Sequence, residues 1–426
     1  MNTRTRRPAL VLAAASTAAA LALAGCTAGG GSDADSITIL TAASPGTPGG
    51  DLFQSVIDDF TEESGITVNV EFGGEEVPLV FETSVAANKQ ADLVNINPVA
   101  NPLSWIDNGI VVPVDEYLDE WGLTDRLLPA ALAEWTRDSD GQVQGFPFEG
   151  YQWPVWFNTA LFEQAGVDIP TTTDELIDAA AALRAAGIQP FAIGGNDWSG
   201  QKLLLQIAQS YLTPEEAKEV FTNGGWCSTP AALKGLELFV ELRDAGVFID
   251  DAGGLEASSM SAAFYTGQAA MMSAGSWEMA NVEESLAPNV LFGGFPVPAD
   301  GEYDLPTAYQ GTANGYWIST KGVEKIDLIR QFIEYLYSPE VAARYVNEAQ
   351  VITALETDPA LLDSDINPLL AQITSELPAT VEYAVHPDKY IPGTLTEQFI
   401  RQTALAFQPG TTADAACAAL DSVYGG

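Results

Sequence analysis

Apolar and polar positions change their period several times after residue 36. Ile37 to Leu40 form a β-branched apolar run, which predicts a strand. The next apolar side chains recur three or four positions apart and predict a helix that ends near Gly65, with a stripe of Phe53, Val56, Ile57 and Phe60. Apolar and polar residues then alternate, which predicts a second strand through Val68, Val70 and Phe72.

The same order of elements continues and returns later in the chain. A helix is expected over roughly 78–88 and an apolar strand over 91–96. Thr172 and Glu175 form a capping box, Gly187 ends the helix that follows, and a strand is expected over 191–193. The stripe of that helix consists of Leu176, Ala179, Ala180 and Leu183. Strands that alternate with helices predict an α/β fold with parallel sheets.

Ligands of open parallel sheets bind beyond the carboxyl ends of the strands, where the exit loops converge. Here the predicted exits carry Ser44, Gly73 to Glu76, Asn97 to Asn101, and Asn196 to Trp198. A further run, Gln268 to Met272, predicts another buried strand, and the turn Gly275-Ser276 brings Trp277 to the same edge. An aromatic side chain at this place indicates a ligand platform; a place for Trp277 in the core is the alternative.

The composition indicates a globular chain with more than one hydrophobic core. It has 426 residues, of which 47% are hydrophobic and 18% are charged, and chains of this length divide into lobes or domains. Asp and Glu outnumber Lys and Arg by 58 to 17, which gives a formal net charge of -41. Such a field repels polyanions, so nucleic acid is excluded as a partner, and an acidic ligand would need a basic cluster that the sequence lacks.

Little in the sequence supports metal, cofactor or triad chemistry. The chain has one histidine, His386, and no cysteine spacing that resembles a zinc site. A Ser-His-Asp or Cys-His arrangement has equally little to draw on. We therefore expect no metal and no cofactor.

The amino terminus has the organisation of an export signal. Arg4, Arg6 and Arg7 precede an uncharged run, Ala9 to Leu23, that is too short to span a bilayer and suits a signal peptide. The run ends in Leu23-Ala24-Gly25-Cys26, which resembles the lipobox of bacterial lipoproteins. That resemblance implies a signal peptide over 1–25, a lipid on Cys26, a flexible tether over 26–36 and an extracytoplasmic protein anchored to the cell membrane. Arg6-Arg7 leaves twin-arginine export as a minor alternative.

Two cysteines remain if Cys26 carries a lipid. Cys227 and Cys417 are an even pair in an oxidising compartment. A disulfide between them would close a loop of about 190 residues, a favourable length in the chain-entropy model. We expect the pair to be bonded; two unpaired buried thiols are the alternative.

Several motifs occur in the order found in one family. Gly145-Phe146-Pro147 is followed by Val155 to Gly166 (VWFNTALFEQAG), by Pro170 and by Thr173 to Leu176 (TDEL). A second block, AFYTGQAAMMSAGSW, runs from Ala263 to Trp277. The series is completed by Phe295 to Pro298, Gly315 to Ser319 and Phe332 to Tyr345. Together these motifs resemble the extracellular solute-binding proteins (family 1, maltose-binding class) of bacterial carbohydrate ABC transporters.

The resemblance implies a two-lobed α/β fold of the periplasmic-binding-protein type, with each lobe a mostly parallel sheet flanked by helices and with hinge crossovers between them. We assign residues 37–148 and about 296–345 to the N-terminal lobe, and 149–295 and about 346–426 to the C-terminal lobe. The resemblance also implies a monomer that closes on one ligand, ABC permease subunits as partners, and no catalytic acid pair.

The same resemblance points to residues that line the cleft between the lobes. They are Trp277, Trp198, Asp197, Glu149, Tyr151, Gln152, Trp153, Ser44, Glu75, Asn97, Asn101, Gln310 and Asn314. Aromatic planes suit the C–H faces of sugar rings, and fixed polar groups suit their hydroxyls. Structural alternatives stay open: Trp153 and Trp198 as core, Asn97 and Asn101 as turn residues, Asp197 as a helix cap and Glu75 as a solvated charge. Five further tryptophans are assigned to structure: Trp105, Trp121, Trp135, Trp226 and Trp317.

Three functions are compatible with these features. The first is capture of a mono- or oligosaccharide outside the cell and its delivery to an ABC permease by hinge closure, which is not an enzymatic activity. A binding protein for a cationic ligand such as a polyamine is the alternative, because acids and aromatics also suit a buried cation. A secreted glycoside hydrolase is the third, since two suitably spaced carboxylates would suffice.

Overall fold

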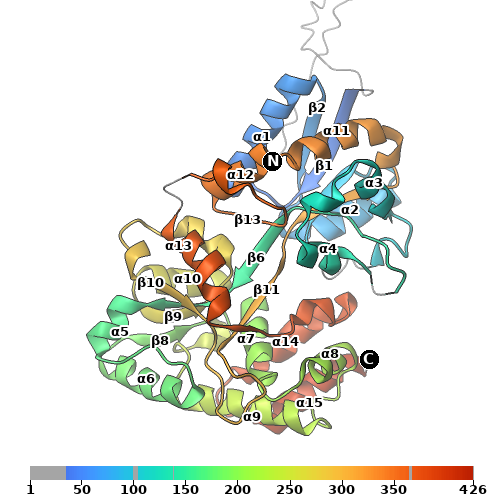
Figure 1. Cartoon of the computed structure of the whole chain (residues 1–426). Helices are drawn as coiled ribbons and strands as arrows, with labels where there is room; N and C mark the ends of the chain where they lie inside the picture. Colours follow the sequence, from blue (N-terminus) through green and yellow to red (C-terminus); the bar gives the residue numbers. More distant parts are fainter. Residues whose placement is uncertain (1–34, 99–103, 138, 364–366, 426) are drawn as a thin grey trace, which may run out of the picture.

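The chain folds into two α/β lobes joined by a third sheet (Figure 1). The computed structural model describes residues 35–98, 104–137, 139–363 and 367–425. In Figure 1 the first lobe lies above the second, and strands β6 (Glu149–Trp153) and β11 (Thr307–Thr312) run between them. The predicted two-lobed α/β fold is thereby confirmed. Within the described residues, no helix combines the length and apolarity that a membrane crossing requires.

The sheet of the first lobe is mixed, with strand order β2-β1-β3-β12-β4 and with β5 also paired to β12. Its strands are β1 (Ser36–Thr41), β2 (Thr67–Phe72), β3 (Leu93–Ile96), β4 (Val111–Val112), β5 (Phe146–Pro147) and β12 (Gly315–Ser319). β1 runs parallel to β2 and β3, as the sequence predicted, whereas β12 returns antiparallel beside β3. The carboxyl ends of the three parallel strands therefore lie at one edge, which faces the second lobe.

Among the described residues, six α-helices belong to this lobe. They are α1 (Pro48–Ser64), α2 (Val77–Ala86), α3 (Asp115–Glu120), α4 (Pro129–Trp135), α11 (Ile326–Leu336) and α12 (Pro339–Ala349). α1 begins where the Thr47 side chain accepts a hydrogen bond from the backbone N–H of Gly50, and it ends at Gly65, which adopts a φ of 76°. That left-handed conformation favours glycine at the end of a helix. Because α1 follows β1 after a short loop, its first turn lies at the strand-exit edge.

The sheet of the second lobe has the order β10-β7-β9-β8. Its strands are β7 (Val155–Asn158), β8 (Gln189–Ala192), β9 (Ala269–Ser273) and β10 (Val290–Gly293). β8 and β9 run parallel, but β7 is antiparallel to both β9 and β10. β8, β9 and β10 thus share one direction, and β7 is reversed, as β12 is in the first lobe. The reversal arises because β7 continues directly from the hinge strand β6 and so runs away from the hinge, whereas β9 runs toward it.

The helices of the second lobe come from two distant parts of the chain. They are α5 (Thr159–Ala165), α6 (Thr173–Ala185), α7 (Trp198–Ala208), α8 (Pro214–Asn223), α9 (Pro230–Asp244), α10 (Ala257–Tyr265), α13 (Pro368–Ala371), α14 (Thr396–Ala406) and α15 (Ala413–Tyr424). The predicted capping box is present at the start of α6, where Thr172 and Glu175 bond each other's backbone N–H.

The hinge sheet has the order β13-β6-β11-β14, with β13 (Ile352–Thr353) and β14 (Glu382–Tyr383) at its edges. The hydrophobic clusters show where the chain changes lobe. Phe295 packs in the core of the second lobe and Tyr316 in that of the first, so the return crossing is β11 and not residue 296. Ala349 still packs in the first lobe, although Val346 of the same helix packs in the core of the second, so the last crossing lies at β13, a few residues beyond the expected 345.

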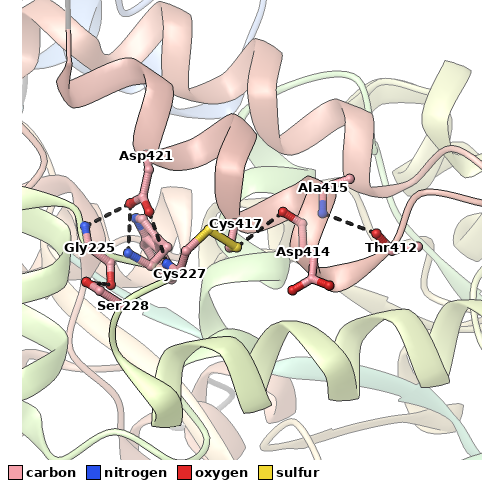
Figure 2. The surroundings of a disulfide bond; sticks show 9 residues. Gly225, Cys227, Ser228, Thr412, Asp414, Ala415, Cys417 and Asp421 are labelled. Atoms are coloured by element: carbon pink, nitrogen blue, oxygen red, sulfur yellow. Dashed lines mark hydrogen bonds between the residues drawn. A yellow bond between two sulfur atoms is a disulfide. The ribbon is translucent and has the colours of Figure 1, made fainter.

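A disulfide joins Cys227 to Cys417, with Cα atoms 5.1 Å apart, and ties α15 to the loop before α9 (Figure 2). Asp421, one turn further along α15, accepts hydrogen bonds from the backbone N–H groups of Gly225, Trp226 and Cys227 at 2.7 to 3.0 Å (Figure 2). The covalent bond and the charged acceptor together fix the last helix to the second lobe.

Replacing both cysteines by serine tests how much this link stabilises the protein. Because the bond joins residues 190 positions apart, it restricts the unfolded chain, and its loss should lower the free energy of unfolding by about 2 to 4 kcal/mol in urea titrations. A reducing agent should lower the stability of the wild type to the same level and leave the double variant unchanged. Equal stability of the two proteins in oxidising buffer would contradict this expectation.

Candidate ligand-binding cleft

A cavity of about 360 Å³ lies between the two lobes beside the hinge sheet. The first lobe lines it with the loop after β1, the start of α1 and the end of α12; the hinge adds Glu149 and Gly150. The second lobe contributes the 3-10 helix η6 (Ser276–Asn281), which directly follows β9. Exits of strands from both lobes therefore converge on one cavity, and a ligand there would touch both lobes and the hinge.

Trp277 is the exposed aromatic residue of this cavity. Its side chain is 45% exposed, which removes the alternative that it is a core residue. A Cβ atom on Gly275 would lie 2.1 Å from the indole ring. The ring thus folds back over the backbone of Gly275, and only glycine leaves room for it. This contact is a physical reason for the Gly-Ser-Trp order at the end of β9.

Further aromatic rings stand beside Trp277. Its ring centroid lies 5.8 Å from that of Tyr151 and 5.3 Å from that of Trp153, and Trp198 lies 5.5 Å from Trp153. Trp153 is only 4% exposed and donates a hydrogen bond to Ser273. It therefore belongs to the core, which was the structural alternative, and does not lie on the surface of the cleft. Trp198 is 38% exposed at the start of α7. Two exposed rings, Trp277 and Trp198, therefore stand on a buried aromatic base.

Glu149 is the charged residue of the cavity. It begins β6, and its carboxylate accepts a hydrogen bond of 3.0 Å from the side-chain amide of Asn314. Burial raises the pKa of Glu149 to about 7, although the hydrogen bonds from Asn314 act in the opposite direction. Among the described residues that line the cavity there is no Lys or Arg and no other carboxylate. Glu149 is therefore without a cationic partner among the described lining residues.

Gln152 and Gln310, which were predicted to bind ligand, do not line the cavity at Trp277. They line a neighbouring opening of about 220 Å³, which shares Gly150 and Ile352 with that cavity. The amide of Gln152 donates to the side-chain oxygen of Gln310 at 3.4 Å, across the β6–β11 pair. Tyr151 lines the same opening. These side chains lie on the hinge between the lobes. A change in the angle between the lobes would therefore move them relative to one another.

An ion pair connects the lobes beside this opening. Glu134, at the end of α4 in the first lobe, lies 3.1 Å from the ammonium group of Lys389 in the second. Glu134 also accepts a hydrogen bond from the backbone N–H of Thr312 in β11. One buried carboxylate thus contacts the first lobe, the hinge and the second lobe.

Asp197 does not present its carboxylate to the cleft. One oxygen accepts a hydrogen bond from the backbone N–H of Ser199 at the start of α7, and the other accepts from that of Ala257 at 2.6 Å. Both oxygens stabilise helix starts, so the structural alternative of a helix cap is the one that the structure shows.

The remaining predicted residues lie at the rim or outside the description. Ser44 is exposed in the loop after β1 and bonds the carbonyl of Ala42, while its neighbours Ala43 and Thr47 line the cavity. Asn97 is half-buried directly after β3 and is not among the lining residues. Of Glu75 only the backbone is described, within the turn Gly74–Glu76. Asn101 and the predicted lipidation site Cys26 fall outside the described residues.

Several polar lining residues escaped the sequence analysis. They are Thr47, Asn95, Asn281, Tyr316, Tyr345 and Gln350. Thr47 precedes the first helix after a strand exit, a signal that could have found it. Tyr345 and Gln350 belong to the end of α12, which the cleft borders only because α12 packs against α1.

Two further places for a ligand, a metal site and a second cavity, have less support. The described residues contain no group of His, Cys, Asp and Glu that could hold a metal ion. A second cavity, of about 520 Å³, lies in the second lobe beside Arg184 and Arg243. Both guanidinium groups already donate to backbone carbonyls, of Gly246 and Phe248 and of Ala406 respectively, so they hold the fold together there.

Comparison with known proteins agrees with this geometry. The model of a family described as bacterial extracellular solute-binding protein matches residues 43–343. The chain belongs to the bacterial extracellular solute-binding protein family. A probable secreted solute-binding lipoprotein from Streptomyces coelicolor is 41% identical; the alignment covers 93% of this chain and 100% of that one, with a TM-score of 0.82. A chitin oligosaccharide binding protein is 25% identical over 92% of this chain and 98% of its own, with a TM-score of 0.79.

Two curated relatives match part of the chain. The sn-glycerol-3-phosphate-binding periplasmic protein UgpB of Salmonella typhimurium (strain LT2) is 27% identical over 249 residues, 55% of each chain. A protein of Brucella abortus (strain 2308) with the name "Putative binding protein" is 27% identical over 282 residues, 64% of each chain. The chain thus spans less than two thirds of the length of these curated relatives.

The pKa of Glu149 makes the stability of the ligand-free protein depend on pH. Because the folded state raises this pKa from its ordinary 4.5 to about 7, it holds the proton more tightly than the unfolded chain does. Its contribution is present below about pH 4.5 and is lost as the pH rises through about 7. Glu149→Gln should therefore match the wild type at low pH and exceed its unfolding free energy by roughly 1 to 3 kcal/mol above neutrality.

Urea unfolding of both proteins across this pH range measures the difference. Glu237→Gln, at an exposed position of α9, removes the same charge outside the cleft and serves as the matched control. A pH-independent difference for Glu149→Gln would refute the assignment.

Proposed function

We propose that this protein captures a mono- or oligosaccharide in the cleft between its lobes and delivers it to an ABC permease by hinge closure, without catalysing a reaction. The observation that carries the proposal is the exposed face of Trp277 in a cavity lined by both lobes and the hinge. Sugar rings pack their C–H faces on such aromatic planes.

The polar groups of the cavity support a sugar. Asn281, Asn314, Thr47 and Gln350 surround it with amides and a hydroxyl that can both donate and accept. The hydroxyls of a sugar need this mixture, because a buried hydroxyl without a partner costs about 1 to 3 kcal/mol. A phosphorylated ligand is disfavoured, since no Lys or Arg is found among the described lining residues.

The topology supports transport by closure. The lobes connect through β6, β11 and the segment at β13, and these antiparallel pairs can bend with little loss of packing. A ligand that touches both lobes has a higher affinity for the closed state, which is what drives closure. We assign export by the amino-terminal signal and a lipid on Cys26, which would hold a monomer at the outer face of the membrane beside the permease.

A cationic ligand such as a polyamine is the second candidate. Glu149 favours it, because an unpaired carboxylate and the face of Trp277 suit a cation. A glycoside hydrolase needs two carboxylates at the substrate. Glu149 is the single one among the described residues that line the cavity, so this third possibility has less support.

Replacing Trp277 by alanine tests the sugar platform. The affinity for a bound saccharide, measured by calorimetry, should fall at least tenfold because the stacking surface is lost, roughly 1.4 kcal/mol or more. The unfolding free energy should change little, since the ring is 45% exposed.

Trp121→Ala provides the matched control. Trp121 stacks on Tyr117 and Phe146 inside the first lobe, so its loss should lower stability and leave affinity unchanged. If Trp277→Ala retains full affinity, or if polyamines bind and no saccharide does, the proposal fails.

A further inference from the structure

The charges in and around the cleft indicate which charge a bound sugar should carry; this inference rests on the proposed sugar-binding function. The protein carries a formal net charge of -41, and the cavity at Trp277 adds no positive side chain among its described lining residues. A cleft with low-dielectric walls focuses such a field, so the cavity attracts cations and repels anions.

Glu149, which is half-buried, differs from three carboxylates that each pair with a lysine of the same chain. Asp92 lies 2.9 Å from Lys325, Asp388 pairs with Lys202, and Glu134 pairs with Lys389. Each of these acids is compensated by an ammonium group of the same chain. Glu149 has the neutral amide of Asn314 as its side-chain partner. A desolvated carboxylate without a cation is costly, and proteins keep such groups where a ligand completes them.

The surroundings of Glu149 leave a place for a hydrogen-bond donor. Tyr316 on β12 and Tyr345 on α12 line the same cavity. Burial raises the pKa of both phenols well above the ordinary value, and the charge of Glu149 adds to the effect, so both hydroxyls stay protonated. These hydroxyls can accept hydrogen bonds, so an ammonium group beside Glu149 would find several acceptors and no repelling charge.

A sugar hydroxyl at Glu149 would also find acceptors, but it would leave the buried negative charge uncompensated. An ammonium group on a sugar ring satisfies the acceptors and neutralises the charge at once, and a charge-assisted bond is roughly twice as strong as a neutral one. Trp277, at the second-lobe wall of the same cavity, can hold the ring carbons of that sugar on its exposed face.

We propose that the ligand is a saccharide that bears a free primary amine, with its ammonium group at Glu149 and its ring on Trp277. The cleft thus selects amino sugars over their acetylated or hydroxyl counterparts. The selection depends on charge at one position of the ring, while the rest of the site recognises features that the three sugars share.

Calorimetric titration with three β-1,4-linked disaccharides separates these classes. The probes are the disaccharide of glucosamine, that of N-acetylglucosamine, and cellobiose. The wild type should bind the glucosamine disaccharide at least about tenfold more tightly than either neutral sugar. Glu149→Gln keeps the shape and the bond to Asn314, and it should weaken glucosamine binding by about tenfold or more while changing cellobiose binding less than about threefold.

Two controls secure the interpretation. Glu237→Gln removes one negative charge on the outer helix α9 and should leave all three affinities unchanged. For the wild type, lowering the pH to about 5 protonates Glu149 and should weaken glucosamine binding alone, without any substitution.

Each outcome decides between the proposals. If a neutral disaccharide binds as tightly as the glucosamine disaccharide or more tightly, the amine assignment fails and the sugar-capture function stands. The same holds if Glu149→Gln lowers the affinities for the glucosamine disaccharide and for cellobiose by the same factor. If no saccharide binds, or if spermidine alone binds, the sugar function fails and the amino-sugar inference with it.

Discussion

The antiparallel pairing of β6 with β11 is the constraint on which the rest of the structure depends. These two strands hold the lobes together, and they place two polar groups of the cleft, Glu149 and Asn314. Glu149 begins β6, Asn314 follows β11, and the backbone of Glu149 bonds the carbonyl of Asn314. The acid and its amide partner are thus brought together by the same pairing that forms the hinge.

Two carboxylates, of Glu134 and Glu149, lie at the hinge, where the lobes move relative to one another. The carboxylate of Glu134 bonds the hinge and pairs with Lys389 across the lobes, while Glu149 lies at the cavity without a cation. Glu134 therefore contributes to the contact between the lobes in the ligand-free protein. Glu149 has no cation beside it, so a ligand can supply one. A ligand that neutralises Glu149 and covers Trp277 supplies contacts that exist only when both lobes touch it, which is the differential affinity that closure requires.

Much of the fold could be predicted from the sequence because local patterns and motif order agreed. The periodicity around β1, α1 and β2 matched the observed elements to within a few residues at their ends. The direction of β7 and the positions of the crossings at β11 and β13 were missed, since they follow from how two lobes share a chain and leave no local signal.

The site was less predictable for a similar reason. Trp277 was predicted from its place after a strand and from a motif. Its ring can fold over the backbone of Gly275 because glycine has no Cβ atom there. Asp197 and Trp153 stand at equally suggestive positions, but the first caps two helices and the second fills the base of the aromatic cluster. Tyr316 and Tyr345 reach the cleft through packing between distant segments, which spacing along the chain does not reveal.

A crystal structure of the complex with the tightest-binding saccharide tests the central claim most directly. The account predicts a closed cleft, a sugar ring on the face of Trp277 and a donor group of the ligand at the carboxylate of Glu149. A ligand bound at another place, such as the cavity beside Arg184 and Arg243, or a ligand in the cleft that touches neither Trp277 nor Glu149, would contradict it.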